Sequence, residues 1–147
     1  MAETIEWILR NRSGAIWTTA PDATVYDALA LMAEKEIGAL MVMQGPRLLG
    51  VVSERDYARK VILQGRVSKE TLVREIMTSP AVTVTRRHTV EECMRLVTHH
   101  RVRHLPVMEG DRLVGVVSIG DLVNAIISDQ AHTIHQLHTY IGARYPA

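Results

Sequence analysis

The chain alternates between short apolar runs and stretches in which apolar residues recur at helical spacing. Runs of four or five mainly apolar residues bounded by turn residues are typical of strands. This pattern predicts strands at residues 15–19, 39–43, 48–52, 81–84, 104–108 and 113–117. The turns at Gly45-Pro46 and at residues 109–111 join two pairs of these strands into hairpins.

Apolar residues three and four positions apart predict amphipathic helices between the strands. A short helix carries Ile5 and Ile8 and is expected to stop at Ser13-Gly14. Four further helices are expected to begin after the capping residues Thr24, Ser53, Thr89 and Ser118. The helix after Thr24 should end at Gly38, and the helix after Ser53 should include residues 61–62.

The second half of the chain repeats the first half. Residues 50–56 (GVVSERD) return as residues 115–121 (GVVSIGD), an offset of 65 residues, and no gap is needed from residue 16 to residue 62. Two copies of one unit most simply pack about a pseudo-twofold axis, which creates two related clefts. The predicted fold is α/β (α+β), with two tandem β-α-β-β-α repeats. We divide the chain into a lead-in (1–15), repeat 1 (16–64), a connector (65–78), repeat 2 (79–128) and a C-terminal helical extension (129–147).

Two segments fall outside the repeated unit. The polar connector is expected to contain a short helix carrying Leu72, Val73 and Ile76. The tail is helical from Asp121 to about Tyr140, which is too long for the closing helix of a repeat alone. Additional amphipathic turns usually pack against a partner surface, so the tail predicts a homodimer.

Composition excludes several classes of protein. The chain has 147 residues, of which 47% are hydrophobic and 22% charged, and its formal net charge is +1. This charge does not favour nucleic-acid binding, and no apolar run is long enough for a membrane span. We expect no secretory signal and a cytoplasmic location. The single cysteine, Cys93, is expected to be a packed, unreactive thiol.

Two equivalent corners carry the candidate chemistry, Ser53-x-x-Asp56 and Ser118-x-x-Asp121. A serine followed by an acid three residues later is an ordinary helix-capping arrangement. The corner also presents free N–H groups at a positive helix end, which suits an anion, and its aspartate can accept hydrogen bonds from a ribose diol. Capping alone and nucleotide binding both remain open on these residues.

The order strand–helix–strand–strand–helix, with Gly-Val-Val-Ser-x-x-Asp at the last corner, resembles the cystathionine-β-synthase (CBS) domain. Residues 73–78 (VREIMT) and 103–107 (RHLPV) are similar to further segments of that family, and the resemblance covers about residues 13–128. Residues 53–60 (SERDYARK) resemble small stand-alone CBS-pair proteins. The resemblance implies a flat α/β disc, or Bateman module, with two clefts for adenosine-containing ligands whose ribose the corner aspartate holds.

The resemblance also implies which residues form each cleft. The first cleft would use Val116, Ser118, Gly120 and Asp121 with Arg103, and a base wall of Ile37, Gly38 and Ala39. The second would use Val51, Ser53, Arg55 and Asp56, with Thr78, Val102, Arg103 and His104 across from them. Because two glycines leave room in the first cleft, we expect it to hold a base and a phosphate, with Arg103 at the phosphate.

No catalytic motif is recognisable, so the chain is not expected to be an enzyme or to use a catalytic cofactor. The leading hypothesis is a regulatory module that binds AMP, ADP, ATP or an NAD-like ligand and signals through dimer rearrangement to a client protein. The alternative is a dimeric interaction scaffold with empty clefts. A third hypothesis is a weak enzyme or metal protein using His132, His135 and His138, although their spacing favours a plain polar helix face and no metal site is expected.

Overall fold

The computed structural model describes residues 3–11 and 15–144, and within them the side chains of all residues except 131–133 and 138–144. The predicted helix stop at Ser13-Gly14 lies outside the described residues. Repeat 1 contains β1 (Thr18–Thr19), α2 (Val25–Lys35), β2 (Ala39–Gln44), β3 (Arg47–Ser53) and α3 (Glu54–Lys60). Repeat 2 contains α5 (Val90–His100), β4 (His104–Glu109), β5 (Arg112–Ser118) and the start of α6 (Ile119–Arg144).

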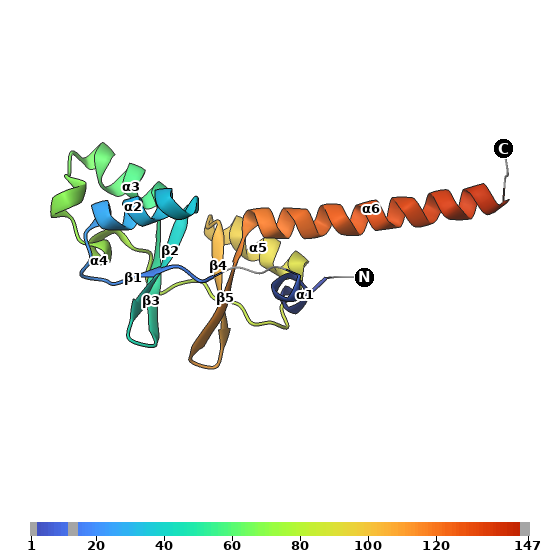
Figure 1. Cartoon of the computed structure of the whole chain (residues 1–147), viewed down its shortest axis with the longest axis horizontal. Coiled ribbons are helices and arrows are strands. Elements are labelled where there is room, and N and C mark those ends of the chain that lie inside the picture. Colours follow the sequence, from blue (N-terminus) through green and yellow to red (C-terminus); the bar gives the residue numbers. More distant parts are fainter. Residues whose placement is uncertain (1–2, 12–14, 145–147) are drawn as a thin grey trace.

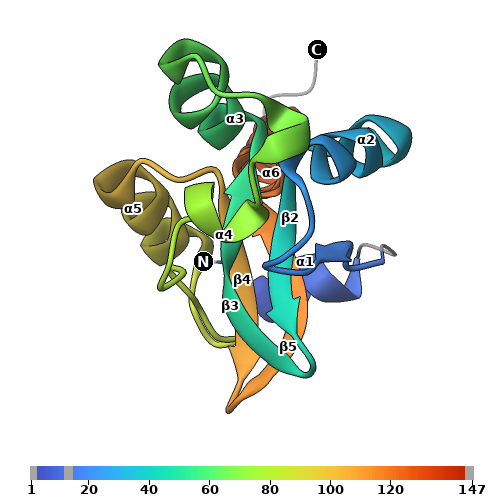
Figure 2. The same ribbon diagram turned by 90° about the vertical axis from the view of Figure 1, so that its left-hand side faces the viewer.

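The two repeats have the same hairpin and the same strand register. In repeat 1, β2 and β3 pair antiparallel with Ala39 opposite Ser53, and in repeat 2, β4 and β5 pair with His104 opposite Ser118. Both hairpins also have a register irregularity at equivalent positions, after Val42 and after Val107. The hairpins lie side by side (Figures 1 and 2), as the predicted pseudo-twofold arrangement requires.

The N-terminal helix α1 (Ile5–Arg10) packs on repeat 2, although it precedes repeat 1 in the chain. The backbone N–H of Ile5 donates to the carbonyl of His88 at 3.0 Å, and Val90 N–H donates to the carbonyl of Glu3 at 2.8 Å. Ile5 and Ile8 are buried in the core of repeat 2. The first residues of the chain therefore complete the second repeat.

The connector completes the core of repeat 1 in the same manner. A 3₁₀ turn at the end of repeat 1 (Ile62–Gln64) leads into the connector, which contains a second 3₁₀ turn (Ser68–Glu70) and α4 (Val73–Ile76). Val73 N–H donates to the carbonyl of Ala23 at 2.8 Å, and both Val73 and Ile76 are buried with the apolar residues of α2, β2 and β3. The predicted short connector helix is thus confirmed, and it holds the first repeat together.

Two predicted strands are shorter than expected. Only Thr18 and Thr19 of residues 15–19 pair with β2, and residues 81–84 form no strand beyond a single bridge from Val84 to Val107. The residues before each pairing point leave the sheet and line the cavities described below.

Two predicted helix ends are also wrong. Helix α2 ends at Lys35, with Glu36 rather than Gly38 in the left-handed conformation (φ 55°), and Arg101 has the same conformation after α5 (φ 55°). Helix α3 ends at Lys60, because Val61 turns inward and is fully buried while the chain enters a 3₁₀ turn. Helix α2 thus ends on a left-handed residue that is not glycine, and helix α3 ends where Val61 enters the core.

Helix α6 begins in repeat 2 and continues well beyond the two lobes (Figure 1). Leu122 and Ala125, in its first two turns, are buried in the repeat 2 core, whereas Ile134 and Leu137 further along are 55% exposed. No helix within the described part of the chain is both long and apolar enough to cross a bilayer.

Candidate functional site

The Ser53–Asp56 corner is a complete capping box at the start of α3. Asp56 Oδ2 accepts from Ser53 N–H at 2.9 Å and from Ser53 Oγ at 3.0 Å, and Ser53 Oγ accepts from Asp56 N–H at 3.2 Å. The other carboxylate oxygen, Oδ1, forms an ion pair with Lys60 Nζ at 3.1 Å. The carboxylate is thereby fixed in place, and only 13% of the Asp56 side chain is exposed.

The Ser118–Asp121 corner has the same geometry at the start of α6. Asp121 Oδ2 accepts from Ser118 N–H at 2.8 Å and from Ser118 Oγ at 3.0 Å, and Ser118 Oγ accepts from Asp121 N–H at 3.1 Å. Each corner is also tied to the strand start of its own repeat, because Glu54 N–H donates to the carbonyl of Gly38 and Ile119 N–H donates to the carbonyl of Arg103. Predicted capping is confirmed in both copies.

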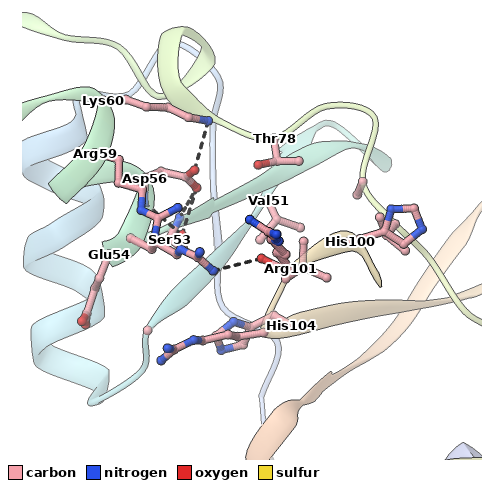
Figure 3. Close-up of a pocket in the computed structure, with 16 residues that line it drawn as sticks. Val51, Ser53, Glu54, Asp56, Arg59, Lys60, Thr78, His100, Arg101 and His104 are labelled. Atoms are coloured by element: carbon pink, nitrogen blue, oxygen red, sulfur yellow. Dashed lines mark hydrogen bonds and ion pairs between the residues drawn. The ribbon is translucent and has the colours of Figure 1, made fainter. Parts of the chain in front are cut away.

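A cavity of about 410 Å³ lies beside the Asp56 corner, and we call it the Asp56 cleft (Figure 3). It is lined by Gly38, Val51, Ser53, Glu54, Arg55, Asp56, Arg59, Lys60, Thr78, Ala81, Val82, His100, Arg101, Val102, Arg103 and His104. Both repeats contribute to it, and Arg55 spans the gap by donating from Nη1 to the carbonyl of Arg101 at 3.0 Å. Five arginine and lysine side chains and two histidines face only two carboxylates, so the cleft attracts anions.

A second cavity, of about 400 Å³, lies on the other side of the pseudo-twofold axis, and we call it the Asp121 cleft. It is lined by Ala15, Ile16, Trp17, Glu36, Ile37, Gly38, Ala39, Met41, His104, Val116 and Ser118. Most of these residues have apolar side chains, with Glu36 and His104 as the ionisable ones, and the Lys35 ammonium lies 4.3 Å from the centroid of the Trp17 ring. The two clefts therefore differ strongly in charge, although they arise from the same repeated unit.

The structure brings together all eight residues predicted for the Asp56 cleft, and their binding role stays a prediction. For the Asp121 cleft it brings together the base wall of residues 37–39 with Val116 and Ser118, but not Gly120 or Asp121 itself. Arg103 lines the Asp56 cleft and is not among the described residues that line the Asp121 cleft. Its carbonyl accepts from Ile119 N–H at the Asp121 corner, and its expected role at a phosphate there stays a prediction.

Several lining residues were missed by sequence reasoning. Arg59 and Lys60 follow Asp56 on α3 by three and four positions, a helical spacing that could have indicated them. Trp17 and Arg101 had no comparable signal, because they reach the clefts from a loop and from a left-handed helix end.

His104 lies between the two clefts and lines both, together with Gly38. Burial lowers the pKa of His104 below its usual value, and the charge of Arg103 lowers it further, while the nearby Asp121 carboxylate opposes this shift. The His104 ring therefore favours its neutral form, with one nitrogen donor and one acceptor for a ligand in either cleft.

Comparison with known proteins identifies the class. The sequence model of the CBS domain matches residues 14–63 and 73–128. The chain therefore belongs to the CBS domain family and carries two tandem CBS domains. CBS-domain pairs are generally regulatory, non-catalytic modules.

The relatives are themselves CBS-domain proteins. The chain is 42% identical over 135 residues to the CBS domain-containing protein CBSX3, mitochondrial, of Arabidopsis thaliana; the match covers 88% of this chain but 65% of that protein, so the chain spans less than two thirds of it. It is 33% identical over 115 residues to CBS domain-containing protein YhcV of Bacillus subtilis, covering 78% and 81% of the two chains.

The cytoplasmic location expected from the sequence stays a prediction.

Solved structures share the fold closely. A protein with CBS domains from Burkholderia ambifaria is 51% identical, with a TM-score of 0.83 over 86% of this chain and 96% of that one. A hexameric CBS-CP12 protein from bloom-forming cyanobacteria is 29% identical, with a TM-score of 0.74 over 97% of this chain and 89% of that one. These likenesses agree with the predicted fold class.

The tail histidines do not define a metal site in the described structure. Among the residues whose side chains are described, no three His, Cys, Asp or Glu residues gather around a point that could hold a metal ion. His135 is described and exposed, whereas the side chains of His132 and His138 lie outside the described residues.

Proposed function

We propose that this protein is a regulatory module that binds an adenine nucleotide between its two CBS domains. The observation that carries the proposal is the ring of basic side chains around the Asp56 carboxylate. A nucleotide needs cations for its phosphates and an acceptor for its ribose diol, and the Asp56 cleft offers both within one cavity. AMP, ADP, ATP and NAD all share the ribose and base that such a site would hold.

The phosphates are assigned to the Asp56 cleft rather than to the Asp121 cleft. Arg55, Arg59 and Arg103 line the former, and arginine pairs bidentately with phosphate oxygens. The Asp121 cleft has no lysine or arginine in its described lining and has Trp17 on its wall. It suits an aromatic base better than a chain of phosphates.

A ligand would act by favouring one arrangement of a homodimer over another, and so change the affinity for a client protein. This requires that the two arrangements bind the nucleotide with different affinity. Self-association is supported by the cyanobacterial CBS-CP12 relatives, which are described as hexameric. The hydrogen bond from Arg55 Nη1 to the carbonyl of Arg101 joins the two repeats across the Asp56 cleft, so a nucleotide bound there would act on the relative position of the repeats.

The test is thermal melting of the purified protein with AMP, ADP, ATP, NAD and GMP. A ligand that binds only the folded state must raise the melting temperature. We expect an adenine nucleotide to raise it, Arg103→Gln to reduce that rise, and the exposed hairpin arginine variant Arg112→Gln to keep it. The absence of any shift with all five nucleotides would overturn the proposal.

One observation favours the second candidate function, an interaction scaffold with empty clefts. The hydrogen bonds of Asp56 with Ser53 and of Asp121 with Ser118 account for both corner aspartates as helix caps. On this alternative, Asp56→Ala and Asp121→Ala each cost about 1 kcal/mol of stability and change no ligand response. Under our proposal Asp56→Ala also abolishes the melting shift.

A further inference from the structure

Helix α6 has two apolar faces, and only one of them packs against its own lobe. Leu122 and Ala125 are buried against repeat 2. Val123, Ile127, Ile134 and Leu137 are 40%, 55%, 55% and 55% exposed. Figure 1 shows that the far half of the helix leaves the lobes entirely.

The exposed residues recur with the period of a coiled coil. Val123, Ile127, Gln130, Ile134 and Leu137 are spaced by four, three, four and three residues, and the sequence continues the pattern at Ile141. This is a repeat of 3.5 residues, in which Ile127 and Ile134 occupy a positions and Val123, Gln130 and Leu137 occupy d positions. In the same heptad frame the buried Leu122 and Ala125 occupy c and f positions, on the opposite side of the helix. The seam therefore faces away from its own lobe.

The charges around this seam favour a second copy of the same helix. In the heptad frame the flanking e and g positions are Asn124, Ile126, Ala131, Thr133, His138 and Tyr140, with no Asp, Glu, Lys or Arg. From residue 123 to residue 141, two identical helices can thus meet without opposing like charges, and the next d position is Arg144, the last residue of α6. Most of the stability of helices in proteins comes from packing of an apolar face, so the projecting turns of α6 gain from burying the seam.

We infer that α6 forms a parallel, two-stranded coiled coil with α6 of a second copy. Isoleucine at a positions favours two strands, and Gln130 sets the orientation and register. In a parallel pair Gln130 meets Gln130 of the second copy, and the two amides can hydrogen-bond. In an antiparallel pair an a position faces a d position, so Gln130 would face an isoleucine with its amide unpaired. This inference rests on the homodimer of the proposed function and is independent of its ligand.

The first test is the oligomeric state of the full chain by sedimentation equilibrium over a range of concentrations. Wild type should be a dimer. Ile134→Lys, which places facing charges in the seam, should raise the dimer dissociation constant at least about tenfold. The matched control Gln136→Lys adds the same charge to an exposed position off the seam and should leave the dimer intact. A monomeric wild type, or an Ile134→Lys protein that associates as wild type does, would overturn the inference.

The second test fixes the orientation by oxidation of introduced cysteines. Gln130→Cys should form a disulfide between two copies, whereas Gln136→Cys should not. The native Cys93 is fully buried and does not compete for oxidant. A dimer in which Gln130→Cys fails to cross-link, or in which both variants cross-link equally, contradicts the parallel pairing.

Melting with ATP separates this inference from the nucleotide proposal. If Ile134→Lys is monomeric and its melting temperature still rises with ATP, both proposals stand. If the wild-type dimer shows no ligand response, only the nucleotide proposal fails.

Discussion

Lys60 forms an ion pair with the Asp56 carboxylate and donates a hydrogen bond to the connector at the same time. Its Nζ lies 3.1 Å from Asp56 Oδ1 and donates to the carbonyl of Ile76 at 2.8 Å. Repeat 2 has no counterpart, because Ala125 occupies the equivalent position and is buried in the core. The two corners therefore share their capping geometry but differ in charge and in their link to the neighbouring segment.

We predict that Lys60→Met destabilises the protein by about 1 kcal/mol. The variant keeps most of the apolar stem but loses a half-exposed ion pair and a hydrogen bond to a carbonyl, each worth about 0.5–1 kcal/mol. Urea unfolding measures this change. Arg47→Met, at an exposed hairpin position, is the control and should leave the free energy of unfolding unchanged. Equal stability of Lys60→Met and wild type would show that the two contacts of the Lys60 ammonium add nothing to the free energy of unfolding.

Two equivalent glycines are predicted to respond differently to alanine. A Cβ on Gly50 would lie 2.4 Å from the carbonyl oxygen of Thr78, which forms a backbone pair with Val51, so the backbone itself must move. A Cβ on Gly115 would instead meet the end of the Leu9 side chain at 2.8 Å, and a side chain can move more easily. We expect Gly50→Ala to cost about 2–3 kcal/mol and Gly115→Ala clearly less.

Urea unfolding of the two glycine variants tests this difference, and a double variant identifies its cause. Leu9→Ala combined with Gly115→Ala should cost less than the sum of the two single changes, because truncation of Leu9 removes the clash. Strict additivity would show that Leu9 is not the obstacle. A Gly50→Ala protein as stable as wild type would show that the Thr78 backbone can move away from residue 50 without a cost in stability.

Much of the fold could be predicted from the sequence, because the internal repeat determines the order of the elements and how the strands pair. The offset places the hairpins, the caps at Ser53 and Ser118 and the strand registers, all of which depend on local residue patterns. The exchange of α1 and α4 between the repeats was not predicted. Helix periodicity shows that Ile5 and Val73 lie on apolar faces, but it cannot show which core those faces enter.

The clefts were predictable only in part for a similar physical reason. Residues on the corners and strand starts, such as Asp56 and His104, follow from the repeat and the family resemblance. The position of Arg103 does not follow, because the family resemblance places this residue in both clefts, whereas of the two described linings it belongs to that of the Asp56 cleft. The charge difference between the clefts therefore emerged only from the three-dimensional arrangement.

His104 is predicted to make stability depend on pH in the acid range. Burial, with Arg103, lowers the pKa of His104 in the folded protein despite the opposing charge of Asp121. The unfolded chain therefore binds a proton at a higher pH, near the usual value of about 6.5, and the free energy of unfolding falls as the pH drops below it. His104→Gln should flatten this dependence, measured by urea unfolding between pH 5 and pH 7.5.

The exposed His99→Gln variant is the control for His104 and should keep the wild-type pH dependence. Since both variants remove one titratable ring, a difference between them isolates the effect of burial. If His104→Gln and wild type lose stability in parallel as the pH falls, burial of His104 is not the source of the dependence.

Cys93 is predicted to react with thiol reagents only when the protein unfolds. Its side chain is fully buried in the repeat 2 core, and burial, with the nearby Glu92 charge, raises the pKa of the thiol to about 11. The thiolate is the reacting species, so at pH 8 the folded protein offers very little of it. Labelling with a chromogenic disulfide should be slow in buffer and fast in urea, and the rate should rise with urea as the unfolded population does.

The control is the Gln136→Cys variant, which supplies an exposed thiol that should react at once with one equivalent of reagent. Rapid labelling of Cys93 in the native protein would instead mean that α5 and α6 separate locally without global unfolding.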